Sequence, residues 1–154
     1  MSMDQNHGRL NPHDRSAVIR LLDDVGSTPG SWCNLSFQEL EDAAHEESPL
    51  FGFLAARGPA NSLATIMRES ADSPLSVGIQ HRAGVKAAAQ LREADLGVPE
   101  GARVRQDHPR RGLVVEWPQD AGTEALADWL FASMRFLNRG RFSETINWTW
   151  NVPT

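Results

Sequence analysis

The sequence predicts an α+β protein: a helical N-terminal half packed on a ferredoxin-like (β-α-β-β-α-β) antiparallel sheet that has its helices on one face. Helix signals concentrate before residue 48, strand and helix patterns alternate after residue 74, and the net charge changes from −6 over 1–74 to +1 over 75–154. The loop Ser70–Pro74 separates the two parts. We expect a helical acidic subdomain (1–74) and a ferredoxin-like subdomain (75–154) within one compact unit.

Two helices are predicted early in the chain. Asn11 stands before Pro12, and apolar residues recur at helical spacing up to Val25, which predicts a helix over 12–25. Ser36 and Glu39 have the spacing of a capping box, which predicts a second helix that runs to Glu47.

The rest of the first half carries weaker patterns. The spacing of Leu63, Ile66 and Met67 predicts a third, short helix. The apolar segment 50–54 fits either element type, and the polar residues 1–10 are expected to be disordered.

The second half alternates between strand and helix patterns. Continuous or alternating apolar residues predict strands, and apolar stripes of helical period predict helices. The expected strands are 75–80, 102–106, 113–117 and 145–150, and the expected helices are 83–95 and 123–138.

This topology brings basic residues to one end of the sheet, which we call the basic pole. The end of the first strand, the start of its helix, the 107–112 turn and the end of the second helix meet there. The predicted binding residues are Arg82, Lys86, His108, Arg110, Arg111, Arg139 and Arg141. Gly84 keeps the N-terminus of the first helix open to anions.

The pole suggests a non-catalytic binding or adaptor protein for an acidic protein or a phosphate-bearing ligand. Two alternatives remain open. A small metal-independent phosphoesterase or nuclease would use His81 and His108 as acid and base. A structural subunit would form homo-oligomers by placing its acidic half on the pole of another copy.

Composition excludes several classes of function. A net charge of −5 disfavours a nucleic-acid coat, and no apolar run is long enough to cross a membrane. Cys33 is the single cysteine, which favours a reducing compartment, the cytoplasm. No cofactor motif is present, and Asp42, His45 and Glu46 lack the further ligands that a metal site needs.

Two side-chain patterns predict packing rather than binding. Trp148 and Trp150 share one face of a strand and are expected in the core. Arg103 and Arg105 share a face of the neighbouring strand, where Glu116 is the expected cross-strand partner.

Overall fold

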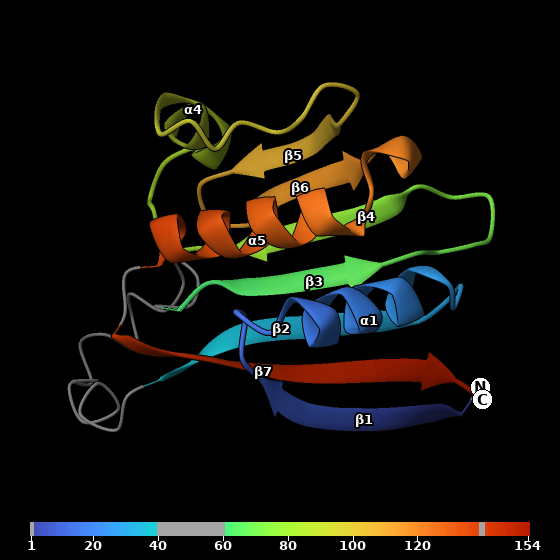
Figure 1. Cartoon of the computed structure of the whole chain (residues 1–154). Helices are drawn as coiled ribbons and strands as arrows, with labels where there is room; N and C mark the ends of the chain where they lie inside the picture. Colours follow the sequence, from blue (N-terminus) through green and yellow to red (C-terminus); the bar gives the residue numbers. More distant parts are fainter. Residues whose placement is uncertain (1, 40–60, 139–140) are drawn as a thin grey trace.

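The structure is a computed structural model that describes residues 2–39, 61–138 and 141–154. This part of the chain forms a seven-stranded antiparallel sheet of strand order β1-β7-β2-β3-β4-β6-β5 (Figure 1). The strands are β1 (Met3–Leu10), β2 (Trp32–Glu39), β3 (Leu63–Met67), β4 (Leu75–Gln80), β5 (Arg103–His108), β6 (Gly112–Trp117) and β7 (Phe142–Pro153). The helices are α1 (Arg15–Gly26), α4 (Ala87–Glu93) and α5 (Thr123–Leu137), with the 3-10 turn η2 (Gln119–Ala121) before α5.

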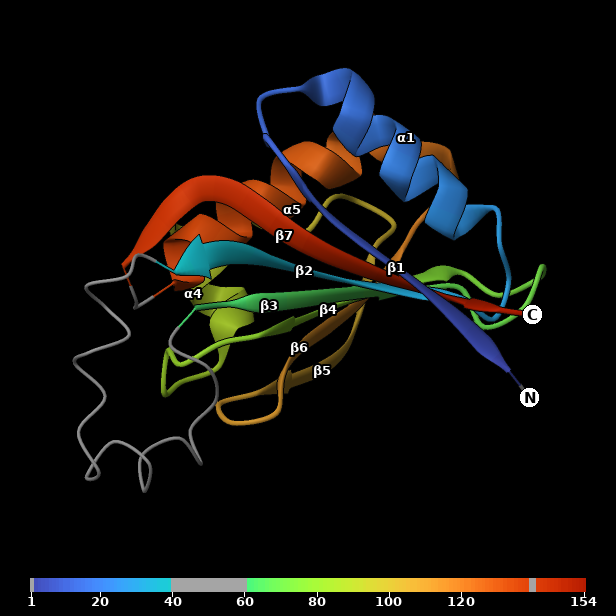
Figure 2. The ribbon, with the colours of Figure 1, turned by 90° about the horizontal axis from the view of Figure 1, so that it is seen from below.

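The two longer helices cover one face of the sheet. In Figure 2, α1 and α5 lie together on the same side of the strands. They are joined by an ion pair from Arg15 to Asp128 (2.6 Å), and Trp129 Nε1 donates to Leu96 O (2.9 Å) in the chain after α4. Within the described residues, no helix covers the opposite face, which we call the open face.

Side-chain alternation determines which residues the helices bury. In β2, Cys33, Leu35 and Phe37 are buried while the residues between them are partly exposed. Residues directly opposite each other in antiparallel strands point to the same face. Inward rows therefore cross the sheet, one of them formed by Cys33, Ile66, Val77 and Val115.

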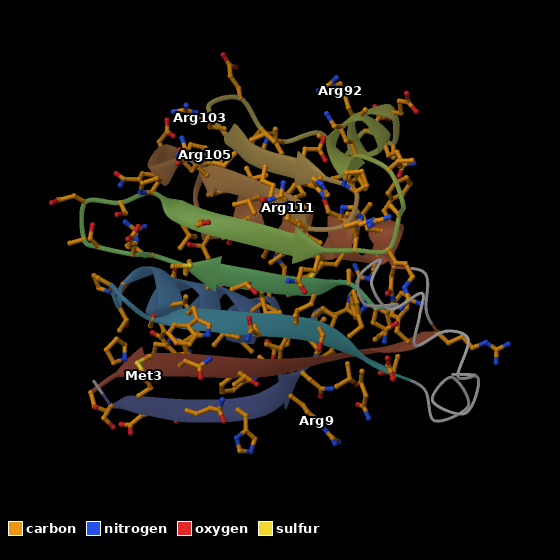
Figure 3. All side chains as sticks on the ribbon, turned by 180° about the vertical axis from the view of Figure 1, so that it is seen from behind. Met3, Arg9, Arg92, Arg103, Arg105 and Arg111 are labelled. Carbon is orange, nitrogen blue, oxygen red and sulfur yellow. The ribbon has the colours of Figure 1, made fainter. Side chains whose placement is uncertain are left out.

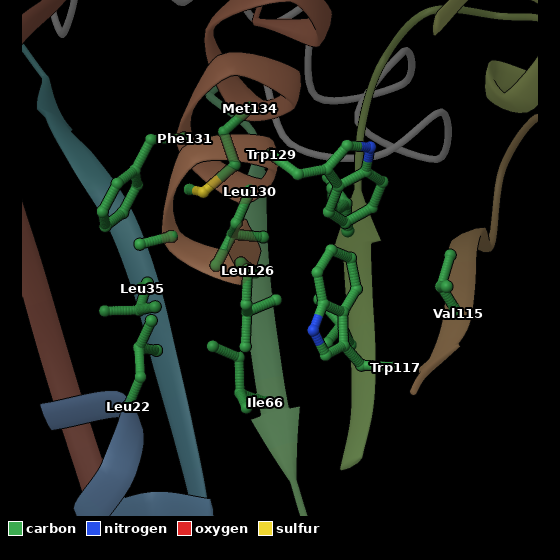
Figure 4. Packing of buried hydrophobic residues seen from close by; sticks show 14 of the residues in the cluster. Leu22, Leu35, Ile66, Val115, Trp117, Leu126, Trp129, Leu130, Phe131 and Met134 are labelled. Atoms are coloured by element: carbon green, nitrogen blue, oxygen red, sulfur yellow. The ribbon is translucent and has the colours of Figure 1, made fainter. Parts of the chain in front are cut away.

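The core lies between these inward rows and the helices. Leu126, Leu130 and Met134 of α5 are almost fully buried, and α1 adds Leu22 (Figure 4). Each buried aliphatic side chain of this size contributes about 1.5–3 kcal/mol. Trp148 and Trp150 are partly buried against this cluster, so their predicted packing role is confirmed.

The predicted fold class is wrong. The first half contributes three strands, so it is not a helical unit packed on a separate sheet. Strand β7 lies between β1 and β2, whereas a ferredoxin-like sheet would place it beside β4. Only β4, α4, β5 and β6 keep the split β-α-β arrangement, with β6 between β4 and β5.

The first half was predicted to be helical because residues at helical spacing occur within segments that also alternate with the period of a strand. Ser36 and Glu39 belong to β2, not to a helix start, because the period-two pattern of residues 32–38 buries a whole face at once. The segment 63–67 is likewise strand β3 rather than a helix. The part of the predicted helix beyond Glu39 and the apolar segment 50–54 lie outside the described residues.

Other elements are close to expectation. The strands predicted over 75–80 and 113–117 and the helix over 123–138 are confirmed as β4, β6 and α5. The first helix begins at Arg15 rather than at Pro12, because Asp14 caps it by accepting from Ala17 N (3.3 Å). Residues 3–10 are not disordered but form the edge strand β1, paired along its length with β7.

Gly112 fixes how the β5–β6 turn meets β4. Its φ is +92°, and a Cβ there would lie 2.4 Å from the Ile79 carbonyl oxygen. Gly112→Ala should therefore lower the free energy of unfolding by about 2–4 kcal/mol, measured by urea titration. Gly26→Ala is the control: a Cβ there meets nothing within 4 Å, and a gain of up to about 1 kcal/mol is expected. Equal stability of the two variants would contradict this account.

Candidate binding face

The chain segments of the predicted basic pole do meet at one end of the sheet. Gly112, the first residue of β6 after the turn, lies against the backbone of Ile79 and Gln80 at the end of β4. The start of α4 contacts Asp107 of β5, and Asn138 after α5 accepts from Ser62 N (3.0 Å) before β3. All of these segments lie on the left in Figure 1.

The expected anion site at the N-terminus of α4 is already occupied by a carboxylate of the chain itself. Ala87 N donates to Asp107 Oδ1 (2.8 Å), and Ala88 N donates to Asp107 Oδ2 (3.4 Å). A carboxylate at this position satisfies free amides and complements the helix dipole. The prediction that this helix end is open to an external anion is therefore wrong.

His108 has a structural role in the turn. Its Nδ1 accepts hydrogen bonds from Arg110 N (3.0 Å) and Arg111 N (3.1 Å). This ring nitrogen must remain unprotonated to do so, and the ring thereby holds the turn in a fixed shape.

His81 is fully buried at the end of β4. Its Nδ1 accepts from Ala83 N (3.2 Å), so the ring organises the chain that leads to α4. A phosphodiester in solvent cannot reach a ring with no exposed surface, and the geometry gives no support to a phosphoesterase that uses His81 and His108.

The remaining pole residues have different surroundings. Lys86, Arg110, Arg111 and Arg141 are exposed, whereas Arg82 is partly buried. Arg139 lies outside the described residues. Arg135, at the end of α5, forms an ion pair with Glu144 (2.9 Å) and lies over the ring of Phe37. Its charge therefore stabilises contacts within the fold.

The open face presents two cross-strand rows of outward side chains next to the turn. The first row runs through Asn151, Trp32, Met67, Ser76, Glu116 and Arg103. The second runs through Thr149, Asn34, Thr65, Gly78, Val114 and Gln106. The rows combine polar side chains with an apolar group: Met67, which is 37% exposed, the directly opposed Trp32, and Val114.

A hollow of about 210 Å³ lies in the middle of this face. Its floor is Gly78, which has no side chain, between Thr65 on β3 and Val114 on β6. Met67 and Ser76 lie to one side, and Gln80 and Arg111 to the other. Arg111 thus links the predicted pole to the open face.

Arginines border the face on its β5 side. Figure 3 shows Arg103 and Arg105 at this edge and Arg111 over the neighbouring strands. Arg105 Nε lies 3.3 Å from Glu116 Oε1, which confirms the predicted cross-strand pair. Glu116 is the one acidic side chain at the outward positions of β4, β5 and β6. Positive charge therefore exceeds negative charge around Arg103, Arg105 and Arg111.

The residues of this face that the sequence patterns did not indicate as a site are Trp32, Met67, Gly78 and Val114. The available signal was Gly78 itself, a glycine in the interior of the correctly predicted strand 75–80. Such a glycine weakens a strand and often marks the close approach of a ligand or another backbone.

The described residues contain no group of three or more His, Cys, Asp and Glu side chains placed to hold a metal ion. Asp42, His45 and Glu46 lie outside that part of the chain. Among the described helices, none combines the length and apolar character that crossing a membrane requires. No family model, curated protein or solved structure shows a significant match to this chain.

Cys33 lies in β2 and is fully buried. Burial raises the pKa of its thiol to about 12, against the opposing effect of a backbone hydrogen bond from Thr149. A buried thiol that remains protonated is a poor nucleophile.

This shift predicts a pH-dependent loss of stability. The unfolded thiol ionises near its ordinary pKa of 9.0 while the folded thiol stays neutral, so rising pH favours the unfolded state until about pH 12. Above pH 9.0, the stability advantage of the wild type over Cys33→Ala should shrink by about 1.4 kcal/mol per pH unit. Urea titrations of both proteins between pH 8 and about 10.5 measure the difference, and parallel stability curves would contradict it.

Proposed function

We propose that the protein is a non-catalytic binding protein that recognises an acidic protein partner through the open face, with its proposed site of action in the cytoplasm. The observation that carries the proposal is the composition of this face. Trp32 and Met67 are directly opposed on β2 and β3, and Val114 lies on β6 of the same face, next to the strand that carries Arg103 and Arg105. No described helix covers this face.

This combination is typical of protein interfaces. Aromatic residues, Met and Arg are enriched in interfaces, and Trp and Arg are frequent among the residues that dominate the binding energy. The face is also broad, since six cross-strand neighbours share each outward row. A broad surface suits a macromolecule better than a small substrate.

The charge distribution favours an acidic partner. The acidic side chains Asp23, Asp24, Glu124 and Asp128 lie on α1 and α5, in the helical layer. Arginines predominate on the β5 side of the open face, although the whole chain carries a net charge of −5. An acidic partner would therefore be attracted to the open face rather than to the helical layer, where Arg15, Arg20 and Arg135 offset three of these four carboxylates.

A second copy of the chain is one acidic partner that this proposal allows. The carboxylates of its helical layer, such as Asp23 and Asp24 of α1, would then meet the open face in a head-to-tail contact. An elution volume that shifts with protein concentration would identify this case, and a concentration-independent monomer would leave a different acidic protein.

Charge reversal tests the proposal. Affinity capture from native lysate should retain an acidic protein on the wild type, and Arg103→Glu/Arg111→Glu should weaken its binding at least about tenfold. The control Arg20→Glu/Arg92→Glu changes the net charge equally at exposed positions on α1 and α4, and should leave binding unchanged.

Footprinting of the captured complex then locates the contact. Hydroxyl-radical oxidation of Trp32 and Met67 should fall in the complex, while Phe136 on α5, which is 41% exposed, should react as before. Protection of Phe136 instead, or equal loss of binding in both double variants, would overturn the proposal.

A further inference from the structure

We propose that the hollow at Gly78 receives one aromatic side chain of the partner, with a neighbouring carboxylate of the partner paired to Arg111. The inference rests on the proposed function and adds the recognition chemistry: an aromatic residue next to an acidic group. It depends on three features of the open face, namely the glycine floor, the apolar walls and the free cation at the rim.

The fold does not require glycine at position 78. A Cβ built there would lie 3.8 Å from both Thr65 O and Val114 Cγ2, and 3.9 Å from Leu113 O, which are ordinary van der Waals contacts. Its backbone also lacks the positive φ found at Gly112. A side chain at this position would strengthen the strand, so the main consequence of glycine is the space that it leaves open.

The hollow has the size and lining for an aromatic ring. A cavity of about 150 Å³ holds benzene, and this one measures about 210 Å³. Val114 forms one wall, and Met67 supplies a polarisable sulfur that contacts rings favourably. The hydroxyl of Thr65 is hydrogen-bonded to Asn34 Oδ1 (2.7 Å), so it does not need a partner from the ligand.

Arg111 supplies the charge at the rim. Gln106 Nε2 donates to the carbonyl oxygens of Arg111 (3.1 Å) and Gly112 (3.3 Å), which anchors the backbone from which this arginine projects. In the described part of the chain, the Arg111 guanidinium forms no salt bridge. A guanidinium can bind a carboxylate through two parallel hydrogen bonds and also lie over a ring.

A small probe tests the hollow without knowledge of the partner. N-acetyl-L-phenylalaninate carries both the ring and the carboxylate. Titrated into the isotope-labelled full chain, it should shift the amide signals of Thr65, Met67, Ser76, Gly78 and Val114, with a Kd on the order of 1 mM. N-acetylglycinate, without the ring, should give no saturable shifts, and neutral N-acetylphenylalaninamide should bind about threefold to tenfold more weakly.

Variants connect the shifts to the two proposed contacts. Gly78→Val should unfold at the same or a higher temperature and bind the probe at least about tenfold more weakly, because its methyl groups fill the hollow. Gly78→Ala serves as a smaller replacement should the valine not fold. Arg111→Gln should remove the preference for the carboxylate over the amide, and Thr149→Val, on the same face at β7, should leave binding unchanged.

The outcomes separate this inference from the proposed function. Absence of saturable shifts, or equal binding by Gly78→Val and wild type, overturns the aromatic site. If Gly78→Val retains the captured acidic partner while Arg103→Glu/Arg111→Glu loses it, the acidic interface stands and the aromatic anchor is wrong. Saturable shifts at the hollow with no captured partner would support the site chemistry and contradict the protein-binding function.

Discussion

The inward rows of the sheet are buried under α1 and α5, and this one-sided burial determines the rest of the surface. Because side chains alternate along a strand, burying Cys33, Ile66 and Val77 forces their neighbours Met67 and Gly78 outward. A slip of one residue in any central strand would exchange the two sets and expose the core. The register that buries the core therefore also determines which side chains lie on the open face. These include apolar groups that no described helix covers.

Polar residues near the β5–β6 turn hold the edge of this face in place. Asp107 binds the first amides of α4, His108 accepts from the turn backbone, and Gln106 donates to the carbonyl of Arg111. These hydrogen bonds all lie within the chain, so the three polar side chains stabilise the turn and its neighbours. Their combined effect is a rigid turn, so Arg111 approaches the hollow with less conformational entropy to lose on binding.

An element of this fold follows from the sequence where its local pattern and its tertiary surroundings favour the same structure. The apolar stripe of α5 and the apolar run of β4 each predict one element and are confirmed. In β2, the spacing of Ser36 and Glu39 imitates a helix cap, and only the alternation around Leu35 reveals the strand. Strand β1 has no apolar alternation, since an edge strand of this kind depends on hydrogen bonds to β7. The insertion of β7 between β1 and β2 depends on pairing over more than 100 residues, which no local pattern encodes.

At the site, the Arg105–Glu116 pair followed from strand alternation, whereas the hollow could be found only from the sheet order, which places Thr65 and Val114 on either side of Gly78.

At position 78, the stability of the sheet favours a residue with a side chain, whereas the proposed binding requires glycine. In a central strand, glycine costs about 0.5–1 kcal/mol relative to a residue with a side chain, and the space above it would accept one. The sheet is thus less stable than it could be at the point where the apolar walls of the hollow and Arg111 converge. On the same face, Arg105 is paired with Glu116, and the Thr65 hydroxyl in the hollow donates to Asn34 Oδ1, so these polar groups are satisfied before any partner arrives. The features that remain in the hollow are an apolar space and the Arg111 guanidinium, which forms no salt bridge with the described residues; together they are complementary to an aromatic residue beside a carboxylate.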